Sequence, residues 1–283
     1  MKSLERYSLW IALRPFSLVV ALISCALGVL IAWQDGYQDV LVALLVVGGG
    51  VLAQAGINLI NDIEDVAGLA DHPERTGVLA MIRRNQWVGI VCFAGAALIA
   101  LYLIWLRGQA LFWVVLFSGI AALSYNMGPF SFKHRGLALI QVFVLMGVVM
   151  VQGSYLVMSG HFSMLALLHS LPVSLLVSLL LLSNELRDWE SDRRNGIGTL
   201  AVRIGYRNSV RLYWLLILGA YLLALVIAFS GQLHQVLWLL LPLPLLVPIQ
   251  GYLHAARRPR LTPLTGRFFF LFGLGYLLAL GAG

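Results

Sequence analysis

Residues 163–183 have the sequence SMLALLHSLPVSLLVSLLLLS, with no Asp, Glu, Lys or Arg. A helix needs about 20 mostly apolar residues to cross the hydrocarbon core of a bilayer. Eight further segments have the same character: 16–33, 40–60, 87–106, 110–127, 136–158, 212–229, 233–254 and 268–283. Backbone polar groups within lipid must be hydrogen-bonded inside their own segment, so these runs predict helices. The sequence therefore predicts an all-α polytopic membrane protein, a bundle of about nine transmembrane helices.

The composition agrees with a membrane protein and predicts a single integral-membrane domain over 1–283. Hydrophobic residues make up 60% of the chain and charged residues 11%, with a mean hydropathy of +0.90. These values lie outside the range of soluble domains. Within the run 233–254, three prolines are expected to kink the helix: Pro242, Pro244 and Pro248.

The basic residues predict how the chain is oriented. If the N-terminus is cytoplasmic, all but one of the 19 Lys and Arg residues fall on the cytoplasmic side, and only Arg107 falls on the other. We therefore expect a cytoplasmic N-terminus and a place in a bacterial inner membrane. This bias, with attraction to anionic lipid, accounts for the net charge of +7 without any nucleic-acid partner.

All but three of the 12 acidic residues occur in two patches. The first patch contains Asp62, Glu64, Asp65, Asp71 and Glu74, and the second contains Glu185, Asp188, Glu190 and Asp192. In each patch an Asn precedes an Asp by four residues: Asn58 precedes Asp62, and Asn184 precedes Asp188. Residues three and four apart share one face of a helix. We therefore expect both patches to project from helix ends at the cytoplasmic side and to meet at one cavity.

Two facing groups of carboxylates repel each other unless a cation lies between them. Mg²⁺ takes oxygen ligands and commonly combines one or two carboxylates with substrate phosphates. The predicted metal ligands are Asp62, Asp65, Asp188 and Asp192, which would hold a diphosphate through Mg²⁺. Neighbouring cations are candidate phosphate ligands: Arg187, Arg193, Lys133 and Arg135. Helix-capping acids in hydrated loops, and cations that only set topology, are the alternative interpretation.

The two motifs resemble those of the UbiA superfamily of membrane-embedded prenyltransferases. The matching segments are Asn61-Asp62-Ile63-Glu64-Asp65 with Asp71, and Asn184 through Asp192. Leu13-Arg14-Pro15 also fits the start of that superfamily. Among its branches, the chain is most similar to the 1,4-dihydroxy-2-naphthoate polyprenyltransferases, in the segments 58–62, 125–129, 135–137 and 196–205. It departs from that branch at Ile197, where a Lys is usual.

The resemblance implies a Mg²⁺-dependent transfer of a polyprenyl group from a polyprenyl diphosphate to an aromatic acceptor. The expected acceptor is 1,4-dihydroxy-2-naphthoate, in menaquinone biosynthesis. The resemblance also implies residue roles: Asn58, Asn61 and Asn184 orient the metal ligands or the phosphate, Tyr125 bonds the diphosphate, Asp71 binds or deprotonates the acceptor hydroxyl, and Arg14 pairs with an acceptor carboxylate. Interface positions and loop capping explain Tyr125, Arg14 and Asp71 equally well.

Three alternatives to this function remain open. The first is another aromatic acceptor, such as 4-hydroxybenzoate or homogentisate. The second is a transporter, although transporters usually place ionisable groups or broken helices near the bilayer midplane, and here the acids lie at the predicted rim. The third is a family member that has lost its activity.

Overall fold

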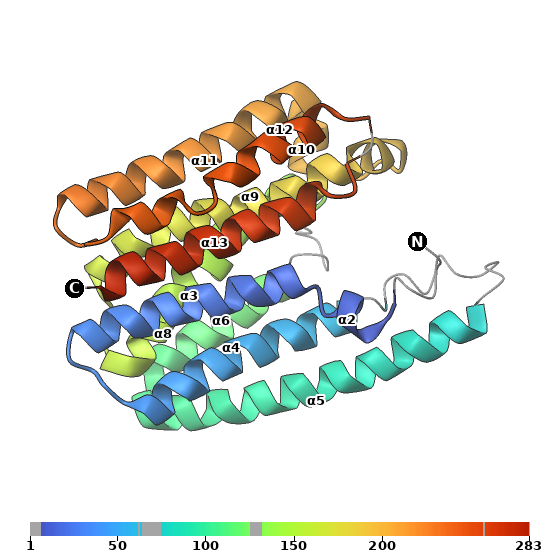
Figure 1. The fold of residues 1–283 in the computed structure, drawn as a ribbon. Coiled ribbons are helices and arrows are strands. Elements are labelled where there is room, and N and C mark those ends of the chain that lie inside the picture. Colours follow the sequence, from blue (N-terminus) through green and yellow to red (C-terminus); the bar gives the residue numbers. More distant parts are fainter. Residues whose placement is uncertain (1–6, 62, 64–74, 125–131, 257, 283) are drawn as a thin grey trace.

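The computed structural model describes residues 7–61, 63, 75–124, 132–256 and 258–282, and these residues form a bundle of helices (Figure 1). In chain order the helices are α2 (Leu9–Ala12), α3 (Pro15–Gln34), α4 (Val40–Asn61), α5 (Arg75–Arg107), α6 (Gln109–Leu123), α7 (Ala138–Val142), the π-helix η2 (Phe143–Val149), α8 (Met150–Ser159), α9 (Met164–Arg194), α10 (Leu200–Ile204), α11 (Tyr206–Phe229), the 3₁₀ helices η3 (Val236–Leu240) and η4 (Leu243–Leu245), α12 (Leu246–His254) and α13 (Leu261–Gly281).

The predicted all-α membrane fold is confirmed, with one span shorter than expected. Eight helical segments in the described part of the chain are long and apolar enough to cross a membrane. The ninth predicted segment, 110–127, corresponds to α6, whose 15 residues give a helix of about 22 Å. A hydrocarbon core is about 30 Å thick, so α6 is shorter than that core even when it stands upright.

Two helices extend well beyond their apolar runs. The 33 residues of α5 begin at Arg75, twelve positions before the predicted span, and exposed Arg83 and Arg84 lie in this extension. The 31 residues of α9 continue through the second acidic motif to Arg194, so α9 is about 46 Å long. The apolar runs mark the lipid-crossing part of each helix, whereas the polar ends are helical as well.

The segment 233–254 is interrupted at two of its three prolines, as predicted, whereas Pro248 lies inside the regular helix α12. Pro242 and Pro244 lie at the 3₁₀ helix η4, and a regular α-helix forms only from Leu246 onward. Proline has no backbone N–H and clashes with the preceding turn, so it disrupts the helical ladder.

Close contacts between small residues set the spacing of α4 and α5. A Cβ at Gly56 would lie 2.6 Å from Cδ2 of Phe93 and 3.1 Å from the carbonyl oxygen of Gly89. A Cβ at Gly89 would lie 3.0 Å from Cβ of Leu59. Small residues allow helix backbones to approach closely in membranes, where lipid removes most of the hydrophobic drive for association.

Helix α9 lies at the centre of the bundle. It packs against α3, α8, α11, α13 and η2, and its buried side chains extend from Ala166 to Leu186. Packing therefore holds α9 as far as Leu186, and the part of the second motif that follows is partly or fully exposed.

Candidate functional site

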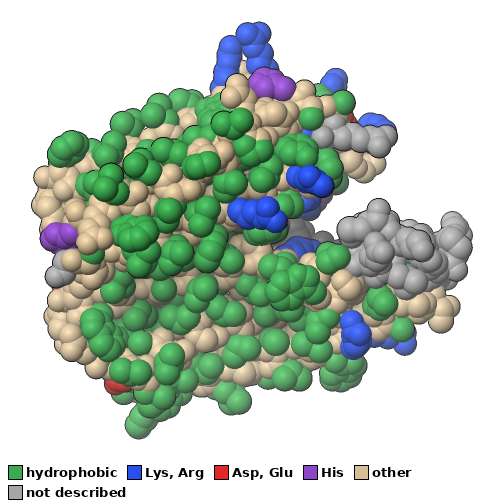
Figure 2. Space-filling view, viewed as in Figure 1, with side chains coloured by type: hydrophobic (Ala, Val, Ile, Leu, Met, Phe, Trp, Pro, Cys, Tyr) green, Lys and Arg blue, Asp and Glu red, His purple; other side chains and the backbone are tan. Residues whose placement is uncertain are grey.

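The second motif lies at the same end of the bundle as the last turn of α4. Helices α4 and α9 both finish at the end of the molecule that also carries α2 and α10 (Figure 1). The space-filling view is hollowed at this end, and Lys and Arg side chains gather at the edge of the hollow (Figure 2). Asp62, Asp65, Asp71 and Tyr125 lie outside the described residues, and their roles stay predictions.

The four acids of the second patch divide into two kinds by what they contact. Asp188 and Asp192 follow Asn184 at intervals of four residues, on one face of α9, and all three are partly exposed. In contrast, Glu185 is only 5% exposed, and its Oε2 accepts a hydrogen bond of 2.9 Å from the backbone N–H of Ala201. Glu185 thus satisfies the N-terminus of α10, a stabilising arrangement for an acid.

The other glutamate, Glu190, pairs with a buried arginine from the loop before α13. Nη2 and Nη1 of Arg258 donate to the Glu190 carboxylate at 2.5 and 2.9 Å, and Nη1 also donates to the carbonyl oxygen of Leu186 at 3.2 Å. The guanidinium lies 4.4 Å from the ring centroid of Tyr206. These contacts join α9, α11 and the segment before α13, so Glu185 and Glu190 brace the helix that presents the two aspartates.

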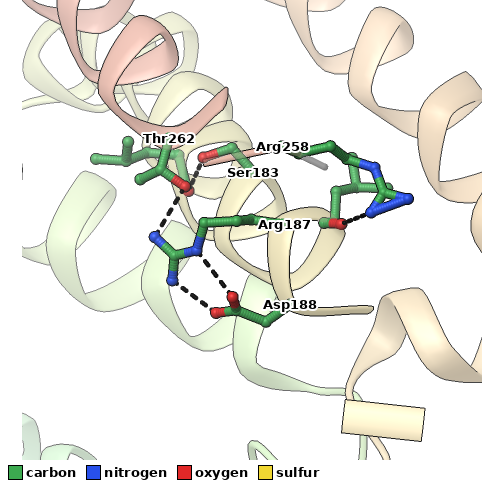
Figure 3. A network of polar contacts seen from close by, with 7 residues as sticks. Ser183, Arg187, Asp188, Arg258 and Thr262 are labelled. Atoms are coloured by element: carbon green, nitrogen blue, oxygen red, sulfur yellow. Dashed lines mark hydrogen bonds and ion pairs between the residues drawn. The ribbon is translucent and has the colours of Figure 1, made fainter. Parts of the chain in front are cut away.

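Arg187 makes a two-pronged contact with the neighbouring Asp188 (Figure 3). Its Nε donates to Oδ1 of Asp188 at 2.9 Å, and its Nη2 donates to Oδ2 at 2.6 Å. On the other side, Nη1 donates to Oγ1 of Thr262 at 3.3 Å, which ties the guanidinium to α13. The two side chains of the pair are 35% and 45% exposed, so both remain within reach of a ligand.

Asp192 has acidic and basic neighbours from two parts of the chain. Burial and the neighbouring Asp188 raise the pKa of Asp192, whereas the charges of Lys133, Arg187 and His134 lower it. Lys133 is half-buried in the turn 132–137, which also carries Arg135. Arg187 thus contacts Asp188, and the charge of Lys133 acts on Asp192, while the roles of these four residues as phosphate and metal ligands stay predictions.

Arg193 lies on a different side of α9 from the two aspartates. Its guanidinium is 5.3 Å from the centroid of the Trp189 ring, and Nε1 of Trp189 donates to the carbonyl oxygen of Ala201 at 3.1 Å. The structure thus directs Arg193 toward α10. A role for this residue in binding substrate remains a proposal.

Asn58, near the end of α4, contacts the start of α3. Its amide nitrogen donates to the carbonyl oxygen of Leu13 at 2.7 Å and to Oγ of Ser17 at 2.6 Å, and its oxygen accepts from Gln54. Between Leu13 and Ser17, Arg14 has φ of +49°, a left-handed conformation that no other described non-glycine residue adopts. Such a conformation costs about 1–2 kcal/mol in an L-residue. Asn58 and Arg14 therefore belong to one junction beside the last turn of α4, where Asn61 ends the helix.

The described donor set fits half of a magnesium site. Asp188 and Asp192 supply two carboxylates from one helix face, the number that Mg²⁺ commonly combines with substrate phosphates. Within the described part of the chain, no three His, Cys, Asp or Glu side chains form a complete metal-binding group. The remaining ligands would have to come from the first motif and from the substrate.

Sequence patterns did not predict the contacts of Glu185, Glu190, Arg258 and Thr262. The two glutamates were recognisable as members of the acidic patch, but their partners lie 16 and 68 positions away. Thr262 carries no sequence signal, because an isolated Thr at the start of an apolar run is ordinary.

The described residues form an all-helical membrane bundle in which two aspartates and several cations lie at one end of α9. Residues 21–274 match the model of the UbiA prenyltransferase family. The chain belongs to this family, as its motifs predicted.

Sequence similarity to relatives covers nearly the whole chain. The 1,4-dihydroxy-2-naphthoate octaprenyltransferase of Escherichia coli (strain K12) is 34% identical over 268 residues, which cover 89% of this chain and 86% of the relative. The UbiA prenyltransferase domain-containing protein 1 of Danio rerio is 28% identical and covers 95% of this chain and 82% of its own.

Solved structures share the fold at low sequence identity. A UbiA homolog from Aeropyrum pernix K1 has a TM-score of 0.66 at 18% identity, covering 92% of this chain and 96% of its own. A UbiA homolog from Archaeoglobus fulgidus, bound to GPP and Mg²⁺, has a TM-score of 0.61 at 14% identity, covering 95% and 99% of the two chains. At these identities the similarity establishes the fold alone.

Proposed function

We propose that the protein transfers a polyprenyl group from a polyprenyl diphosphate to an aromatic acceptor in a Mg²⁺-dependent reaction, with 1,4-dihydroxy-2-naphthoate as the acceptor. The observation that carries this proposal is the grouping of Asp188 and Asp192 with Lys133 and Arg187 at one end of α9. Two supports come from relatives: the octaprenyltransferase activity by which the E. coli protein is named, and the GPP and Mg²⁺ bound to the A. fulgidus protein.

In this proposal the carboxylates of Asp188 and Asp192, with Asp62 and Asp65, hold Mg²⁺. Bound Mg²⁺ supplies positive charge that offsets the charge developing on the diphosphate as the allylic C–O bond breaks. Lys133 and Arg187 bind phosphate oxygens directly, and Thr262 holds the guanidinium of Arg187 on the side away from Asp188.

The remaining predicted residues support binding and orientation. Asn58 and Asn61 fix the last turn of α4 next to the first motif, and Asn184 continues the Asp188 face of α9. Arg135 and Arg193 add positive charge at the rim. Tyr125 bonds the diphosphate, Arg14 pairs with the acceptor carboxylate, and Asp71 binds or deprotonates the acceptor hydroxyl.

The apolar helices exclude water from the allylic cation until the acceptor carbon attacks it, and the diphosphate leaves toward the charged end of the bundle. The attacked carbon of the naphthoate then loses its carboxylate as CO₂, which restores the aromatic ring. We place that end in the cytoplasm of a bacterium, because this arrangement puts all but one Lys or Arg on the inner side. The reaction then belongs to menaquinone biosynthesis.

The test uses purified protein in nanodiscs, supplied with Mg²⁺, geranyl diphosphate or longer homologues, and a panel of aromatic acids. Mass spectrometry should detect a prenylated product that has lost the naphthoate carboxylate, and EDTA should abolish it until Mg²⁺ is restored. Product formed only from 4-hydroxybenzoate or homogentisate would transfer the proposal to that acceptor. Product formed equally well in EDTA would refute the role of the metal.

A further inference from the structure

Two loops at the charged end of the bundle are joined by one arginine. Arg203, in the last turn of α10, donates from Nε to the carbonyl oxygen of Gly198 at 2.9 Å. Its Nη2 donates to the carbonyl oxygen of His134, also at 2.9 Å. One guanidinium therefore connects the loop after α9 to the turn 132–137, although the two segments lie more than 60 positions apart in the sequence.

Two glycines, Gly136 and Gly198, allow the two loops to approach each other closely. Gly136 has φ of +73°, and a Cβ there would lie 2.7 Å from Cδ of Arg203. A Cβ at Gly198 would lie 2.6 Å from the carbonyl oxygen of His134. A larger residue at Gly198 would push the two loops apart, whereas one at Gly136 would be strained at its positive φ and would displace the Arg203 side chain.

Hydrogen bonds connect α9 to α10, and α10 to the turn 132–137. Glu185 of α9 accepts the N–H of Ala201 at the start of α10. At the other end of α10, Arg203 holds the carbonyl oxygen of His134. The residue before His134 is Lys133, whose charge lowers the pKa of Asp192 and Glu185 on α9 and so partly offsets the effect of their burial.

We propose that Arg203 is a positioning residue that acts through Lys133. By fixing the backbone at His134, it holds Lys133 at the end of the bundle where α9 carries Asp192, so that the ammonium can receive the diphosphate. This inference rests on the proposed function for the identity of the ligand, but the placement of Lys133 can be measured without any substrate. If Arg203 only stabilised the loops, its removal would not change the accessibility of the Lys133 amine.

The chain offers a direct measurement, because Lys2 and Lys133 are its only lysines. The intact protein in nanodiscs is treated with an amine-acylating reagent, and mass spectrometry gives the labelling rate of Lys133 relative to Lys2. Lys133 is half-buried, so loss of its anchor in Arg203→Ala should raise this ratio about threefold or more. Arg203→Lys, which keeps a single donor, should give an intermediate ratio. The matched control Arg211→Ala removes an exposed arginine that donates a hydrogen bond to Asn208, and it should leave the labelling ratio unchanged.

Kinetics provide the second measurement. Arg203→Ala should raise the KM for prenyl diphosphate roughly 5- to 10-fold, as expected for a displaced charge-assisted contact, with a smaller effect on kcat and on the KM for the acceptor. Lys133→Ala should raise the same KM, and adding Arg203→Ala to it should have little further effect. Such non-additivity is the signature of two residues that act as one unit.

The outcomes separate this inference from the proposed function. An unchanged labelling ratio in Arg203→Ala, or additive effects of the two substitutions, would overturn the positioning role. If the wild-type protein forms no prenylated product while the ratio still rises, the proposed function fails and the placement of Lys133 by Arg203 stands.

Discussion

Replacing Arg258 by Ala should destabilise the bundle. Among the described arginines at the charged end, we expect this replacement to have the largest effect. The side chain of Arg258 is only 6% exposed, whereas that of its partner Glu190 is 49% exposed. The substitution removes the ion pair with Glu190, the hydrogen bond to the carbonyl oxygen of Leu186 and the contact with the Tyr206 ring. It therefore loosens α9 from α11 and from the segment before α13.

The magnitude follows from these contacts. The bond to the Leu186 carbonyl contributes about 1 kcal/mol. The pair with Glu190 contributes about 0.5–1 kcal/mol, since half of that glutamate stays in water and is screened. The cation over Tyr206 contributes about 0.5–2 kcal/mol. The total of about 2–4 kcal/mol corresponds to a fall in Tm of roughly 5–15 °C, at 2–4 °C for each kcal/mol.

Thermal unfolding in detergent, followed by intrinsic tryptophan fluorescence, would measure this fall. Arg260→Ala is the matched control, because Arg260 carries the same charge two positions later on an exposed site. Glu190→Gln should cost less than Arg258→Ala, since a glutamine oxygen still accepts one of the two hydrogen bonds. The reasoning is wrong if Arg258→Ala melts within 1 °C of Arg260→Ala.

Three further outcomes are expected. Asp188→Asn and Asp192→Asn should each reduce turnover about 100- to 1,000-fold, because each removes a charge stabiliser, while Tm changes little because both sites are partly exposed. Product analysis and melting curves measure the two effects, and near-normal turnover would contradict the assignment. Glu185→Leu should leave the Ala201 N–H without its acceptor and cost about 1–3 kcal/mol, seen as faster hydrogen exchange in α10, whereas Glu185→Gln should retain most of the protection. Ile197→Lys should lower the KM for prenyl diphosphate by several-fold, and an unchanged KM would show that this position makes no phosphate contact.

The sequence predicted the membrane helices because the property that drives them into lipid is local. Each apolar run is long enough to be recognised by itself, and the prolines at 242 and 244 broke their segment as expected. The ends of α5 and α9 were missed, because hydropathy stops at the membrane boundary while the helical hydrogen bonds continue. The short α6 shows the opposite limit, because an apolar run does not by itself give the length of the helix.

The site was predictable to the extent that helix periodicity determines it. The four-residue spacing of Asn184, Asp188 and Asp192 put them on one face, and the structure agrees. That periodicity does not tell which acids serve as braces, because the partners of Glu185 and Glu190 come from α10 and from the segment before α13. The link from Arg203 to His134 was equally hidden, since it depends on two glycines allowing two distant loops to meet.

The length of α9 has a consequence for how the enzyme would meet its substrate. About 46 Å of helix exceeds the hydrocarbon thickness by roughly 15 Å, so if α9 stands upright with Met164 at the far boundary, its aspartates would lie at the level of the lipid headgroups. A long-tailed diphosphate dissolved in the same leaflet already has its head at this depth and need not turn over to dock. Encounter then takes place by lateral diffusion in two dimensions, and inert lipid added at constant bulk substrate should slow the reaction by surface dilution.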